Sequence, residues 1–185
     1  TGGVSTGVLY VGGGNNVTIP VPGSISLSAG VYYFTRATPG DQLGLTRPAA
    51  FRYDFGEARR DDIALIWIGQ NGPSHARAKA DAAAIIRETT SIDKRFLVIS
   101  RPTSTDTEDS EWHDLYGRRF IGIRRYLVDY GLEDVGITPT AQDTTDMTNG
   151  VVPTSLRVDA THFNAAGYHI LGTLVYNRLV ELGYI

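Results

Sequence analysis

Two residues near the C-terminal end of the sequence have the types and spacing of a proton-transfer pair. Asp159 precedes His162 by three residues, and a helical apolar pattern begins directly after Asn164. Because asparagine is a favoured helix N-cap, the pair is expected in a loop just before a packed helix. A carboxylate at this spacing can accept the Nδ1–H of the imidazole, which leaves Nε2 free to act as a general base.

The same pair has an ordinary interpretation, an aspartate before a helix beside a surface histidine. An Asp-x-x-His spacing is weak by itself, because a chain with 4 histidines and 20 acidic residues can contain it by chance. A second polar motif, further upstream, strengthens the catalytic interpretation.

This second motif follows an apolar run at residues 63–68, which is typical of a parallel strand buried on both faces. Gly69 and Asn71 then form a Gly-x-Asn turn ahead of a helical pattern. At the carboxyl edge of a sheet, the Asn71 Nδ2 group can stabilise negative charge that develops on a carbonyl oxygen. The alternative is an ordinary strand-to-helix turn, since Gly and Asn both tolerate positive φ.

The order of these motifs resembles that of the SGNH (GDSL-type) hydrolases. The tract from Arg124 to Asn164 is most similar to phage and actinobacterial members. The resemblance implies that His162 and Asp159 are catalytic, and that Asn71 belongs to the oxyanion hole. Gly3 is similar to the glycine that supplies another oxyanion donor. The implied activity is that of a serine esterase acting on small acyl esters of carbohydrate or lipid, with O-acetyl groups as the first candidates. No metal or organic cofactor is implied.

One block of the family pattern is missing. The Gly-Asp-Ser block that carries the nucleophile should precede Gly3, and nothing there matches it. Gly40 and Asp41 imitate the block, but Gln42 follows them and is no nucleophile. Ser5 is a weak candidate, because no buried strand leads into it. Either a companion polypeptide segment supplies the serine, or the nucleophile is lost and the chain is a non-catalytic carbohydrate-binding or structural module of a virion or cell surface.

The elements that must position these residues alternate between strand and helix from Asp61 onward. Strands are expected at 63–68, 95–100 and 120–123, with helices between them, a long loop at 136–158 and a last helix at 165–182. This pattern predicts a three-layer α/β/α sandwich with a mostly parallel, flavodoxin-like sheet. Before it, residues 8–58 are rich in β signals and predict a small antiparallel elaboration within a single domain at 1–185.

The apolar run at 63–68 suits neither the edge of a sheet nor a face in water. The sequence therefore predicts that a companion segment, ending in Gly-Asp-Ser or a close variant, supplies the missing first strand of the sheet. On this view the chain alone is poorly stable and inactive.

Composition excludes several other classes of function. A formal net charge of −3 and a pI near 5.8 argue against nucleic acid as the main partner. Without cysteine there is no disulfide framework and no thiolate metal site, and His162 and His169 lack a third ligand at zinc spacing. No apolar run is long enough for a membrane span. We expect a soluble protein, extracellular or virion-associated as the resemblance implies.

Overall fold

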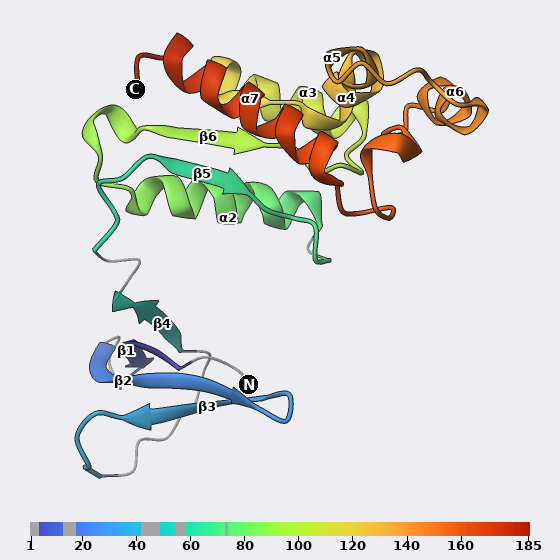
Figure 1. The fold of residues 1–185 in the computed structure, drawn as a ribbon. Coiled ribbons are helices and arrows are strands. Elements are labelled where there is room, and N and C mark those ends of the chain that lie inside the picture. The colour runs from blue at the N-terminus through green and yellow to red at the C-terminus, as the bar shows by residue number, and fades with distance from the viewer. Residues whose placement is uncertain (1–3, 13–17, 42–48, 55–57, 73) are drawn as a thin grey trace. The chain divides into compact units, whose positions relative to one another are not determined.

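The computed structural model describes residues 4–12, 18–41, 49–54, 58–72 and 74–185. The chain separates into two compact units, one through Asp61 and one from Asp62 (Figure 1). Each unit has a sheet of its own, and the fold is mixed α/β.

The first unit is a four-stranded antiparallel sheet in the order β3-β2-β1-β4. Its strands are β1 (Ser5–Gly12), β2 (Thr18–Ser28), β3 (Val31–Arg36) and β4 (Ala50–Tyr53). Ala29 and Gly30 join β2 to β3, and both have positive φ, as a two-residue hairpin turn requires. The antiparallel sheet predicted near the N-terminus is confirmed. Its role as an elaboration of one larger domain stays a prediction.

The second unit holds a parallel sheet in the order β5-β6-β7. The strands are β5 (Ala64–Trp67), β6 (Phe96–Ile99) and β7 (Phe120–Ile121). The helices are α2 (His75–Glu88), α3 (Asp106–Tyr116), α4 (Ile123–Asp129), α5 (Gly131–Asp134), α6 (Ala141–Thr148) and α7 (Ala165–Glu181). Short 3₁₀ helices lie at η2 (Ile92–Lys94), η3 (Gly117–Arg119) and η4 (Thr154–Leu156).

Alternate residues of β6 enter two separate hydrophobic clusters, because successive side chains of a strand point to opposite faces. Leu97 and Ile99 pack with residues of α4 and α7. Phe96 and Val98 pack with residues of α2 and α3. All four side chains are buried, so β6 is the centre of this unit's core.

β5 differs from the prediction that its run is buried on both faces. Ile66 is buried at 3% exposure, but Leu65 and Trp67 are 52% and 37% exposed. Among the strands that the structure describes, β5 pairs only with β6. The prediction of two buried faces is therefore wrong for Leu65 and Trp67, because β5 is an edge strand here.

The predicted loop at 136–158 is also wrong, since it contains α6 and η4. Thr140 and Asp143 form a capping box at the start of α6, in which each side chain accepts a hydrogen bond from the other's backbone N–H. Asp143 is completely buried. The sequence pattern did not predict this helix, because its interior carries polar residues rather than an apolar stripe.

In the part of the chain that the structure describes, no helix is both long enough and apolar enough to cross a membrane.

Candidate active site

The three parallel strands end at one edge of their sheet, where ligand sites of such folds usually form. Ser100, directly after β6, connects all three strand ends. Its carbonyl accepts a hydrogen bond from Trp67 Nε1 at 3.0 Å, and its hydroxyl accepts one from Ile123 N at 3.0 Å. Ser100 is fully buried, so this edge has a rigid base.

The turn after β5 depends on Gly69. Its φ is +94°, and a Cβ there would lie 3.3 Å from both Ala78 Cβ and Arg101 Cδ. Both the backbone conformation and the space therefore favour glycine. Asn71, two residues on, is exposed, and no residue of the described structure hydrogen-bonds to its carboxamide. Its side chain is free to receive a ligand.

The loop before α7 brings Asp159 and His162 together. A bridge between Arg157 and Phe163 closes the base of this loop, and Val158 N donates to the His162 carbonyl at 2.8 Å. Asp159 Oδ2 lies 2.9 Å from His162 Nδ1, which confirms the contact that the spacing predicts. The catalytic role of this contact stays a prediction.

The electrostatics of the loop keep Asp159 ionised. Hydrogen bonds from the His162 side chain and from the backbone N–H groups of Thr161 and His162 lower the pKa of Asp159 to about 2. An ionised carboxylate at Nδ1 favours the tautomer with hydrogen on Nδ1 and a free lone pair on Nε2. Both side chains are exposed, at 54% for Asp159 and 65% for His162. The pair therefore has the orientation of a catalytic dyad without the burial that usually surrounds one.

Two buried carboxylates, neither of them predicted from the sequence, hold the base of this loop. Asp143 accepts hydrogen bonds from Ser155 N and Oγ at 2.9 and 2.8 Å. Asp146 accepts from Thr154 N at 2.9 Å and from Arg157 Nη2 at 3.2 Å. They tie α6 to the segment that leads into the dyad. The capping-box pattern at 140–143 was the one sequence signal that could have pointed to Asp143.

Aromatic rings connect the loop that holds Asp159 and His162, called the dyad loop below, to the end of β5. Trp67 and Phe163 stack with centroids 6.0 Å apart, and Tyr168 of α7 meets both rings edge-on. Asn164 caps α7 by accepting from Ala166 N and Gly167 N. The loop therefore has a fixed place beside the carboxyl end of β5.

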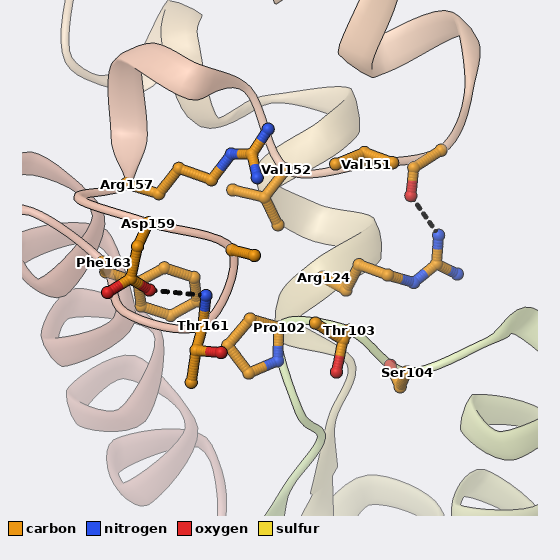
Figure 2. Close-up of a pocket in the computed structure, with 12 residues that line it drawn as sticks. Pro102, Thr103, Ser104, Arg124, Val151, Val152, Arg157, Asp159, Thr161 and Phe163 are labelled. Atoms are coloured by element: carbon orange, nitrogen blue, oxygen red, sulfur yellow. Dashed lines mark hydrogen bonds between the residues drawn. The ribbon is translucent and has the colours of Figure 1, made fainter. Parts of the chain in front are cut away.

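A pocket of about 210 Å³ lies next to the dyad (Figure 2). Its walls come from the segment after β6, from α4 and from the chain on either side of η4. The lining residues are Pro102, Thr103, Ser104, Arg124, Gly150, Val151, Val152, Arg157, Asp159, Ala160, Thr161 and Phe163. Asp159 and Thr161 therefore belong both to the dyad loop and to the pocket, whereas His162 and Asn71 do not line it.

The other predicted site residues are not brought together by the described structure. Gly3 and Gln42 lie outside the described residues. Ser5 is an exposed residue of β1, in the first unit. Gly40 and Asp41 lie after β3, where the Asp41 carbonyl accepts a hydrogen bond from Arg36. Within the described second unit, no hydroxyl group donates to His162 Nε2.

Among the described residues, no group of three or more His, Asp, Glu or Cys is arranged to hold a metal ion. Comparisons with models of protein families, with curated proteins and with solved structures gave no match for this chain.

Proposed function

We propose that this chain is the larger part of a serine ester hydrolase of the SGNH (GDSL) type. The observation that carries the proposal is the 2.9 Å contact between Asp159 and His162, in a loop that leads into the last helix. Supporting it is the Gly-x-Asn turn, which follows β5 at the same edge of the sheet. The substrates are small acyl esters of carbohydrate or lipid, with O-acetyl groups as first candidates, and the protein acts outside the cell or on a virion.

The chemistry is acyl transfer through a covalent intermediate. A serine hydroxyl attacks the ester carbonyl while His162 Nε2 accepts its proton, and His162 then protonates the departing alcohol. Asp159 orients the ring and stabilises the imidazolium. Water, deprotonated by His162, releases the acid from the serine. Asn71 Nδ2 stabilises the oxyanion that forms in both steps.

The serine comes from a companion segment in this proposal. β5 is an edge strand among the described strands, and its Leu65 and Trp67 are large exposed apolar residues. A strand added at this edge would cover both residues and complete the three-layer α/β/α sandwich. The two hydrophobic clusters, which use alternate residues of β6, support that architecture.

A second candidate is a non-catalytic carbohydrate-binding or structural module with the same fold. One observation favours it: in the described second unit no hydroxyl group donates to His162 Nε2. In this alternative the Asp159 hydrogen bonds serve only to shape the loop before α7.

Ester hydrolysis separates the two candidates. The 185-residue chain is assayed alone and together with its upstream coding segment, using p-nitrophenyl acetate. The esterase proposal expects hydrolysis only in the presence of the segment, and loss of that activity in His162→Gln. Activity that is absent in both preparations would favour the binding module.

A further inference from the structure

The pocket beside the dyad offers a ligand mainly apolar surface, although several charged residues line it. Pro102, Val152 and Phe163 form the apolar part of its buried lining, beside the buried polar residues Ser104 and Arg124. Val151 and Ala160 add apolar surface where the pocket opens (Figure 2). Val152 and Phe163 are only 2% and 3% exposed. These walls are fixed by the core on which they stand.

The two arginines of the lining are already engaged with the protein. Arg124 donates to the Gly150 carbonyl at 2.7 Å and to the Asp106 carboxylate. Arg157 donates to Asp146 at 3.2 Å. The Nε atoms of both arginines are buried and have no acceptor in the described structure, so a ligand in the pocket cannot reach them as they stand. Each guanidinium is therefore held by at least one protein acceptor.

Among the other polar side chains of the lining, those of Asp159 and Ser104 are paired, whereas no hydrogen bond involves the hydroxyls of Thr103 and Thr161 in the described structure. Asp159 accepts from Thr161 N at 2.7 Å and meets His162 through both oxygens. Ser104 donates to the buried Asp109 carboxylate at 2.7 Å. A sugar ring needs several free donors and acceptors, whereas an aliphatic chain needs none. Of the two, the lining fits the aliphatic chain.

We infer that this pocket binds the acyl chain of the substrate, and that it takes aliphatic chains longer than acetyl. This inference rests on the proposed function, because the ligand is a substrate only if the protein is an esterase. The preference of the pocket for apolar chains can be tested without catalysis. A methylene group needs about as much room as a water molecule, so 210 Å³ holds roughly seven such groups. An acetyl group would leave most of this space empty, so within the proposed class of small acyl esters the pocket favours acyl groups longer than the O-acetyl groups named first.

The binding test uses the 185-residue chain and uncharged primary amides from acetamide to hexanamide, with a methyl glucoside as the sugar probe. Dissociation constants and backbone amide NMR shifts are measured. We expect each added methylene to tighten binding about two- to fourfold, with the largest shifts at Val152, Thr161 and Phe163. Binding that does not depend on chain length, shifts elsewhere, or tighter binding of the glucoside would overturn the inference.

Two variants of one residue sharpen the test. Val151 is 39% exposed at the opening, so Val151→Phe should fill the pocket. The dissociation constants of the amides should then no longer depend on chain length. Val151→Ala should retain the dependence and extend it to longer amides. The control, Val180→Phe, changes an exposed residue of α7 that does not line the pocket and should behave as the parent. The inference is contradicted if the dissociation constants do not vary with chain length in the parent, or if they vary in Val151→Phe as they do in the parent.

The same series separates this inference from the proposed function. A chain that hydrolyses no ester but binds hexanamide in this pocket supports the inference while the esterase fails. An active esterase whose kcat/KM is the same from acetyl to hexanoyl esters supports the function and overturns the inference.

Discussion

The carboxylate of Asp159 is half exposed, yet its hydrogen bonds lower its pKa to about 2. The ionised form is favoured in the folded state, so the stabilisation that it gives the loop is fully present above the ordinary pKa of 3.8. It is lost as the pH falls toward 2. At neutral pH the dyad therefore always has its acceptor at Nδ1.

Asp159→Asn tests whether this acceptor matters for chemistry. The asparagine Oδ1 can still accept from the backbone of the loop, but its Nδ2 would face His162 Nδ1 and favour the opposite tautomer. In the enzyme completed by its companion segment, we expect kcat to fall by roughly 10³–10⁴ with the fold retained. Asp129→Asn, in an exposed pair with Arg125 on α4, is the matched control. An unchanged kcat would reduce Asp159 to a role in loop shape.

Asn71→Ala tests the oxyanion hole. The exposed carboxamide makes no hydrogen bond within the described structure, so removing it should cost little stability. We expect kcat to fall by roughly 10²–10³ with a modest change in KM. If steady-state kinetics show the parent kcat, Asn71 serves only the geometry of the turn.

Among the elements, α6 and η4 decide where the dyad loop starts. Burial alone would raise the pKa of Asp143, but hydrogen bonds from Ser155 and Thr140 lower it to about 2. The pKa of Asp146 is also lowered, because hydrogen bonds from Thr154, Gln142 and Arg157 outweigh the effect of burial, which raises it. These buried carboxylates stabilise the fold only while they are ionised.

Asp143→Asn tests this connection through stability. Both oxygens of Asp143 accept hydrogen bonds, so the amide of asparagine would meet donors and leave one of them unpaired. The parent should be more stable than the variant by about 2 kcal/mol at pH 6, from the pKa difference. That difference should shrink as the pH falls from 3.8 toward 2.

Urea unfolding at pH 6 and pH 2.5 measures this effect, with Asp129→Asn as the exposed control. A surface pair such as Asp129 with Arg125 is worth at most about 1 kcal/mol. A difference for Asp143→Asn that does not change with pH would show that the Asp143 charge contributes nothing to folding.

The sequence predicted those elements whose apolar residues form either a continuous run or a helical period. The buried strand β6 and the helix α7, with its Asn164 cap, are of this kind, and so is the Asp159–His162 contact, because three residues of loop bring the two side chains together. It did not predict α6, whose stability comes from buried carboxylates bonded to residues at 154 and 155. Nor did it predict the exposure of Leu65 and Trp67, because neighbours in a sheet are set by the whole chain and not by the run itself.

In the whole molecule, we expect a partner strand to pair beside the exposed side chains of β5. Leu65→Thr should change the stability of the chain alone very little, because Leu65 is 52% exposed. It should weaken binding of the companion segment roughly tenfold, since the leucine becomes buried on pairing. Leu115→Thr, on α3 and 57% exposed, is the matched control. Equal dissociation constants for the two variants would place the companion elsewhere.

Covalent labelling of the serine tests whether the companion segment carries a nucleophile that His162 activates. The chain is combined with its companion segment, treated with a fluorophosphonate and mapped by mass spectrometry. We expect a single phosphonylated serine, located in the companion segment, and loss of that labelling in His162→Gln while the circular dichroism spectrum is retained. No labelled serine, or labelling that proceeds at the same rate in His162→Gln, would contradict it.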